Sequence, residues 1–141
     1  MILDLGFESP AFTSFTPANI SQEHYSKLFV GVAPVIRTHA IKLLKDDWKI
    51  HPVAQTRGRC YFNAKLITIP TWAIDRSIEY KSWYIAHELA HAYDKCKHMH
   101  GPEFMEWLKI ICPKEFIHYE LGYKPRNASA AGIGKIDFDS L

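Results

Sequence analysis

Cysteine is scarce in this sequence of 141 residues, and the features of secreted and membrane proteins are missing. The three cysteines, Cys60, Cys96 and Cys112, form no CxxC pair, which excludes a disulfide framework and a zinc ribbon. No apolar run approaches the roughly 20 residues that span a bilayer, and the N-terminus has no basic and long apolar segments typical of a signal peptide. We therefore expect a cytoplasmic protein with reduced thiols and no membrane partner.

An excess of charge of one sign is also absent. The chain has 17 Lys and Arg against 15 Asp and Glu, and its net charge is +2. This balance does not point to a nucleic-acid partner, although Arg57, Arg59 and Lys65 cluster beside Tyr61 and leave DNA open as a partner. Hydrophobic residues make up 48% of the chain and charged residues 23%, which is typical of one globular domain. Composition and charge do not indicate an oligomeric state.

Changes in periodicity divide the chain into three parts. Residues 1–20 have little periodicity and predict an irregular N-terminal arm. Residues 21–123 predict a single folded domain, and residues 124–141, which are rich in small residues, predict a flexible tail.

Helical and strand patterns follow one another within that domain. Residues 21–45 have helical spacing interrupted by Gly31 and Pro34, which favours two helices or one kinked helix. Residues 48–70 contain short β-type runs separated by turn residues and predict about three antiparallel strands. Two further helices are predicted over residues 77–96 and after Gly101-Pro102. The expected fold class is α+β, with N-terminal helices, a small antiparallel sheet, a long central helix and a C-terminal helix.

The long helix carries the motif HELAH, which runs from His87 to His91. Its predicted inward stripe has spacings of three and four residues and consists of Ile78, Ser82, Ile85, Leu89, Ala92 and Cys96. Residues i and i+4 share one face of a helix, so His87 and His91 can bind the same metal ion. Glu88 is rotated by about 100° from His87 and is poorly placed as a ligand, but it can reach a water held by the metal. This is the zincin arrangement, with Glu88 as general base.

A catalytic zinc usually has three protein ligands and an open position for water. We favour His100 as the third ligand because Gly101-Pro102 breaks the helix directly after it and turns the chain back toward the metal. His98 and a downstream glutamate remain alternatives. The candidate glutamates are Glu103, Glu106, Glu115 and Glu120.

The segment HELAHAYDKCKHMHGPEF resembles the active-site region of the SprT-like, or Spartan-type, zinc metallopeptidases. The matching positions are His87, Glu88, His91, His100, Gly101 and Phe104. The segments 56–60 and 67–70 are similar to the two strands that precede the motif in that family, and the resemblance covers roughly residues 20–112. It is a resemblance to a compact version without the C-terminal zinc ribbon.

The resemblance implies a minimal zincin-like fold over residues 21–123, one zinc ion, and a protein or peptide substrate. It implies hydrolysis of peptide bonds through a zinc-bound water activated by Glu88, and it strengthens His100 as third ligand. The alternative is a non-catalytic, zinc-stabilised binding module with DNA as a candidate partner.

Several side chains around the motif have candidate roles. We expect the substrate to lie along an edge strand at Leu66–Ile69. Asp94 is either an acceptor for a ligand N–H or a solvated helix charge. Tyr119, Tyr123 and His118 follow the site and are open candidates for stabilising an oxyanion, with packing or surface roles favoured. For Tyr80, Trp83 and Tyr84, core packing is preferred over a cleft wall.

Overall fold

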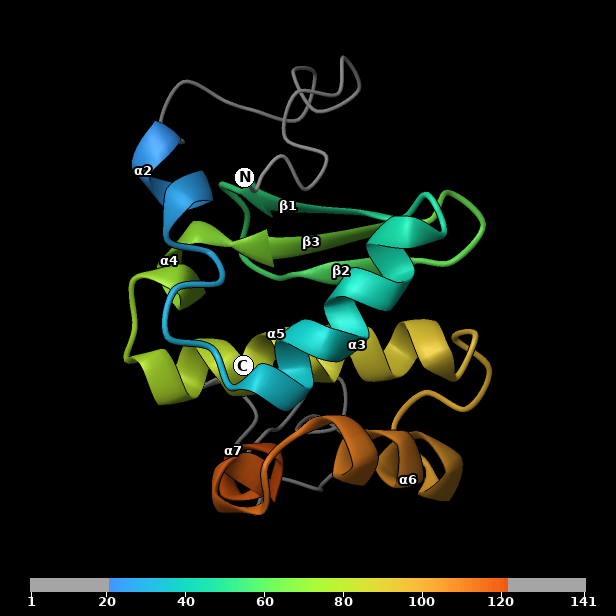
Figure 1. Cartoon of the computed structure of the whole chain (residues 1–141). Helices are drawn as coiled ribbons and strands as arrows, with labels where there is room; N and C mark the ends of the chain where they lie inside the picture. Colours follow the sequence, from blue (N-terminus) through green and yellow to red (C-terminus); the bar gives the residue numbers. More distant parts are fainter. Residues whose placement is uncertain (1–20, 122–141) are drawn as a thin grey trace.

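The computed structural model describes residues 21–121. Over this range the chain forms six α-helices, one 3-10 helix and a three-stranded sheet, so the α+β class is confirmed (Figure 1). The predicted N-terminal arm and C-terminal tail lie outside the described residues, as do the last two residues of the predicted domain.

Two separate helices form the N-terminal part of the described chain. α2 covers Gln22–Ser26 and α3 covers Pro34–Lys45, with Pro34 in the first turn of α3. A proline is tolerated at that position because the first N–H groups of a helix have no intrahelical acceptor. Between the helices Gly31 adopts a φ of 77°, a left-handed conformation that favours glycine. The interruption seen in the sequence is therefore a break between helices, not a kink.

The sheet has mixed topology, and the predicted antiparallel arrangement is wrong. The strands are β1 (Lys49–Val53), β2 (Arg59–Tyr61) and β3 (Leu66–Pro70), and they lie in the order β1-β3-β2. β3 pairs in parallel with β1 and antiparallel with β2. The prediction assumed that consecutive strands are neighbours, but β3 inserts between the two strands that precede it.

The position of β3 also corrects the predicted edge strand. Leu66–Ile69 belongs to the central strand, whose five residues are all buried. β2 is an edge strand, and its two end residues are exposed. Gly58 allows β2 to begin close to β3, since a Cβ atom there would lie 2.4 Å from the carbonyl oxygen of Thr68.

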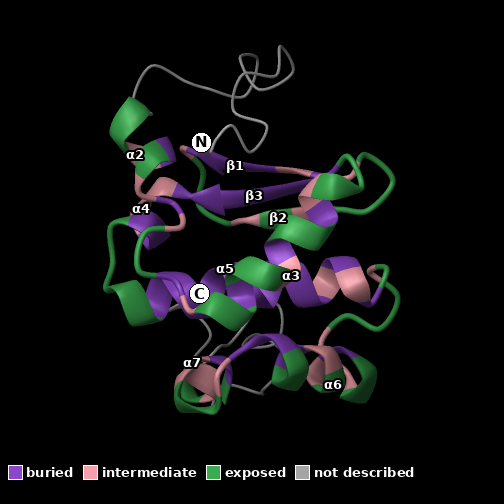
Figure 2. Cartoon of the chain, in the orientation of Figure 1, coloured by how far each residue is buried: buried purple, intermediate pink, exposed green. Residues whose placement is uncertain are grey.

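The long helix α5 (Ile78–Tyr93) is the centre of the molecule. Its N-cap is Ser77, whose hydroxyl accepts a hydrogen bond from the backbone N–H of Tyr80 at 3.1 Å. α5 contacts β2 and β3 on one side and α6 (Pro102–Ile111) and α7 (Ile117–Leu121) on the other (Figure 1). Figure 2 shows that it is buried along most of its length.

The predicted core stripe on α5 is only partly correct. Ser82, Ile85 and Leu89 are fully buried, whereas Ile78 is 46% exposed. Ile78 is the first residue of α5. Because the middle of α5 is covered on both sides, its burial does not follow one stripe.

The C-terminal elements follow the predicted helix break. Gly101 is the N-cap of α6, and the buried face of α6 contains Phe104, Leu108 and Ile111. A 3-10 helix, η1 (Lys114–Phe116), connects α6 to α7, and the short α7 was not predicted. The four-residue helix α4 (Thr71–Ile74) connects β3 to the segment before α5. Across residues 21–121, none of the helices has the length and apolar character needed to span a membrane.

Candidate metal centre

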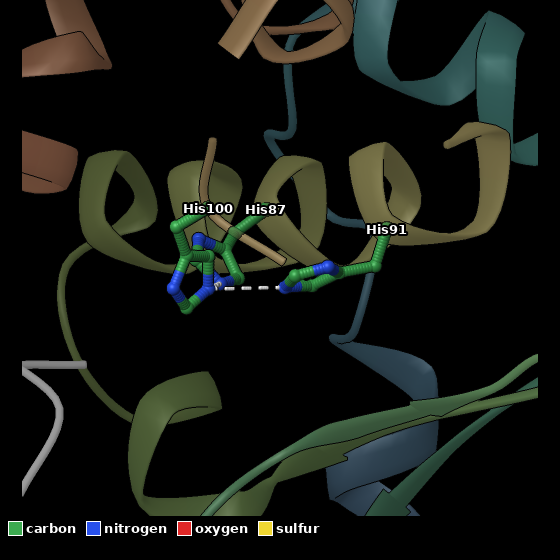
Figure 3. A group of neighbouring side chains, drawn as sticks. All are labelled: His87, His91 and His100. Carbon is green, nitrogen blue, oxygen red and sulfur yellow. Dashed lines mark hydrogen bonds between the residues drawn. The ribbon is translucent and has the colours of Figure 1, made fainter. Parts of the chain in front are cut away.

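Three histidines converge at the C-terminal part of α5 (Figure 3). His87 and His91 lie on α5 one turn apart, and His100 lies in the loop that leads to α6. The Nε2 atom of His100 is 3.2 Å from Nε2 of His87 and 3.2 Å from Nε2 of His91. Candidate ligand atoms of the three residues all lie within 4.8 Å of one another. The residues that sequence reasoning favoured as ligands are therefore brought together.

The loop after α5 delivers His100 to this point. The helix ends at Tyr93, and Lys95 and Cys96 adopt φ values of 57° and 54°, which reverse the chain. The backbone N–H of Cys96 donates to the carbonyl oxygen of His91 at 2.8 Å. The N–H of Gly101 donates to the carbonyl oxygen of His98 at 2.8 Å, immediately before α6 begins.

Asp94 stabilises this loop through its contacts with His98. Its two carboxylate oxygens bond the backbone N–H and the Nδ1 atom of His98, each at 2.8 Å. Asp94 is 5% exposed, so the prediction of a solvated helix charge is wrong. The hydrogen bonds that it accepts come from His98. His98 itself is not part of the histidine group.

Aromatic rings from α6 and from α5 pack against the histidines. The ring centroid of Phe104 lies 5.0 Å from that of His87, 4.5 Å from that of His91 and 5.1 Å from that of His100. Trp83, one turn before His87 on α5, has its ring centroid 5.5 Å from the His87 ring. This apolar enclosure limits hydration of the three imidazoles.

Burial keeps the three imidazoles in their neutral form. It lowers the pKa of His87 to about 3, of His91 to about 2 and of His100 to about 4, and the neighbouring imidazoles add to the effect at His91 and His100. A neutral imidazole keeps a nitrogen lone pair, which is the state that a metal ligand needs. The group is therefore ready to bind a cation at neutral pH.

Glu88 is buried beside this group and is 4% exposed. Burial raises its pKa to about 8, the negative charge of Glu120 adds to this rise, and the positive charge of Arg59 opposes it. The charge of Glu88 also contributes to the raised pKa of the Cys60 and Cys96 thiols. Since Arg59 and Cys60 belong to β2, the carboxylate of Glu88 lies near the edge strand.

Glu120 is the functional residue whose role sequence reasoning missed. It was considered only as an alternative metal ligand, yet it is not in the histidine group. Its Oε1 atom lies 2.7 Å from Nδ1 of His87 and accepts a hydrogen bond from Nε1 of Trp83 at 3.0 Å. It is 4% exposed, and burial raises its pKa to about 7, opposed by His100 and by the Trp83 hydrogen bond. The spacing of 33 residues from His87 has no local pattern that would reveal the contact.

The other candidate residues have structural roles or lie apart from the site. Tyr80, Trp83 and Tyr84 are buried in the core, as preferred. Tyr119 packs on the rings of Tyr80 and Trp83, His118 is exposed, and Tyr123 lies outside the described residues. The group that converges does not include the alternative glutamate ligands Glu103, Glu106 and Glu115.

The geometry of the histidines fits a zinc ion. In a tetrahedral site with Zn–N distances of 2.0–2.1 Å, two ligand nitrogens lie about 3.3 Å apart, and the two Nε2–Nε2 distances here are 3.2 Å. Three neutral imidazoles also match the donor set of catalytic zinc sites, which keep a fourth position open. A comparison with protein-family models, with curated proteins and with solved structures finds no match to this chain.

The metal-free protein is expected to lose stability when the pH falls from about 6.5 to about 5. Burial lowers the pKa of four histidines below the ordinary value of 6.5; they are His51, His87, His91 and His100. Between these pH values the four imidazoles become protonated in the unfolded chain but stay neutral in the folded protein. The unfolded state therefore binds more protons, and lowering the pH favours unfolding. Glu88 and Glu120 have raised pKa values, so at these two groups the folded state binds more protons than the unfolded chain. These two carboxyl groups therefore offset about half of the loss of stability that the four imidazoles cause.

Urea denaturation in the presence of a chelator, at about pH 6.5 and about pH 5, measures this dependence. The expected free energy of unfolding is lower at the acidic pH. Equal or greater stability at about pH 5 would contradict the burial of these histidines in neutral form.

Proposed function

We propose that this chain is a zinc-dependent metalloendopeptidase with a minimal zincin-like fold, as its resemblance to the SprT-like family implies. The observation that carries this proposal is the convergence of the Nε2 atoms of His87, His91 and His100, with the buried Glu88 directly following His87 on α5. His87, His91 and His100 would hold the ion. When bound, zinc supplies Lewis-acid polarisation of a carbonyl group and lowers the pKa of water to about 7.

Glu88 is the general base in this proposal. Its carboxylate accepts a proton from the attacking water and later donates that proton to the amine nitrogen of the leaving group. Burial supports this role, because a carboxyl group with a raised pKa can both accept and return a proton near neutral pH. Glu88 follows the ligand His87 directly on α5, which keeps it beside the ligands without competing for the metal.

The substrate in this proposal is an extended peptide that pairs with β2. In the sheet of residues 21–121, β2 is an edge strand, and β3 occupies its inner side. An extended peptide can hydrogen-bond to the main chain of such an edge. β2 contacts α5, and its residue Arg59 is near enough to Glu88 to affect the carboxyl pKa, so a peptide on β2 would pass close to the general base.

One residue of the basic cluster near the sheet is paired with an acidic residue of this chain. Lys65 is paired with Asp46, with its Nζ atom 3.5 Å from the carboxylate and 3.0 Å from the backbone carbonyl oxygen. One of the three cations in the predicted basic cluster is therefore already neutralised by this chain. We do not extend the proposal to DNA binding.

The test combines metal analysis with an assay of hydrolysis. Protein purified without added metal is expected to contain one equivalent of zinc and to cleave an unfolded protein substrate, with activity removed by a chelator and restored by zinc. Hydrolysis that occurs only when DNA is added would indicate that DNA is a partner of this protein. One equivalent of zinc with no cleavage of any unfolded substrate, with or without DNA, would overturn the peptidase proposal in favour of a zinc-stabilised binding module.

A further inference from the structure

A buried hydrogen-bond network lies behind His87, on the side of the imidazole away from His91 and His100. One oxygen of Glu120, Oε1, lies 2.7 Å from Nδ1 of His87 and 3.0 Å from Nε1 of Trp83. The exposed fractions of these residues are 4% for Glu120, 3% for His87 and 0% for Trp83. The network joins α7 to two successive turns of α5.

Trp83 and the charge of Glu120 together determine the direction of the hydrogen bond between Glu120 and His87. An indole N–H can only donate and an ionised carboxylate can only accept, so Oε1 of the ionised Glu120 is an acceptor toward both partners. The same oxygen faces Nδ1 of His87, and an acceptor there requires the proton of the imidazole to be on Nδ1. The lone pair of His87 is then on Nε2, the atom that lies 3.2 Å from Nε2 of His100.

We propose that Glu120 is a positioning residue, which sets the tautomer and the ring orientation of His87 so that Nε2 is available to a metal ion. This inference rests on the proposed metal centre. A carboxylate that accepts the second N–H of a ligand histidine also makes that imidazole a stronger donor. It follows that the segment after α6 is a functional part of the site through Glu120, which was predicted only as an alternative metal ligand.

The tautomer of His87 is the direct readout. The ring nitrogens of the metal-free protein can be assigned by 15N NMR, and we expect His87 to have its proton on Nδ1. In Glu120→Ala the fixed acceptor is gone, and we expect a mixture of tautomers. A wild-type protein with the proton on Nε2 of His87, or a Glu120→Ala variant with the wild-type nitrogen shifts, would overturn the inference. The wild-type measurement decides even if the variant does not fold.

Metal affinity is the second readout. Competition of Zn²⁺ or Co²⁺ between the protein and a chromophoric chelator is expected to show affinity 10–100-fold lower in Glu120→Ala. Glu120→Gln is expected to lose less, because an amide oxygen can still accept both hydrogen bonds. The control is Glu115→Gln, which changes an exposed glutamate of η1 and should leave the affinity unchanged.

These measurements separate the inference from the proposed function. A wild-type protein that takes up neither metal would overturn the metal centre, and the NMR result would still decide the tautomer. If the wild-type protein and Glu120→Ala bind zinc with equal affinity, the role of Glu120 is overturned and the metal centre is not. A purely structural role would lower the thermal midpoint of the metal-free variant and leave both the tautomer and the affinity of the folded protein unchanged.

Discussion

Glu88→Gln is expected to reduce peptide hydrolysis by about 10²–10⁴-fold and to leave the zinc content at one equivalent. Glutamine has nearly the same size as glutamate, so the buried site remains filled. Its amide cannot accept the proton of the attacking water, which removes the general base. The metal ligands are unaffected because the converging group consists of His87, His91 and His100, without Glu88.

The measurement is kcat/KM on a fluorogenic peptide together with elemental analysis of the same sample. Glu106→Gln is the matched control, since it makes the same change at an exposed position on α6 and is expected to retain wild-type activity. Activity retained in a zinc-loaded Glu88→Gln protein would exclude Glu88 as the base. Loss of zinc in this variant would instead mean that Glu88 helps to bind the metal.

His100→Ala is expected to lower the affinity for zinc by more than about 100-fold, and hydrolysis is lost with the metal. The variant removes the only histidine of the group that is not on α5, and its Nε2 atom is 3.2 Å from Nε2 of each of the other two. Two imidazoles on one face of a helix leave a zinc ion short of the three protein ligands that catalytic sites usually have.

His98→Ala is the comparison that tests this assignment. His98 lies two residues before His100, and its Nδ1 atom bonds Asp94, so we expect His98→Ala to keep its zinc. The backbone N–H of residue 98 also bonds Asp94, and this second contact remains in the variant. Zinc loss in His98→Ala with retention in His100→Ala would reverse the ligand assignment. Chelator competition and elemental analysis distinguish the two results.

Local sequence patterns predicted the parts of the site that are close together in the chain. The i and i+4 spacing of His87 and His91 places both on one face of α5, and Ser77 caps that helix. Gly101-Pro102 ends the loop and begins α6, so the direction of His100 could also be inferred. These features depend on helical periodicity and on backbone restrictions at glycine and proline, which a short stretch of sequence contains.

Contacts between distant segments were not accessible in the same way. The insertion of β3 between β1 and β2, the exposure of Ile78, and the hydrogen bond from His87 to Glu120 all depend on how whole elements pack. No residue near Leu66 specifies whether its strand is central or at an edge, because burial on both faces results from layers formed elsewhere in the chain. Glu120 is an ordinary glutamate in the sequence, and it reaches the histidine group because η1 and α7 fold back against α5 and bury its carboxylate against Nδ1 of His87.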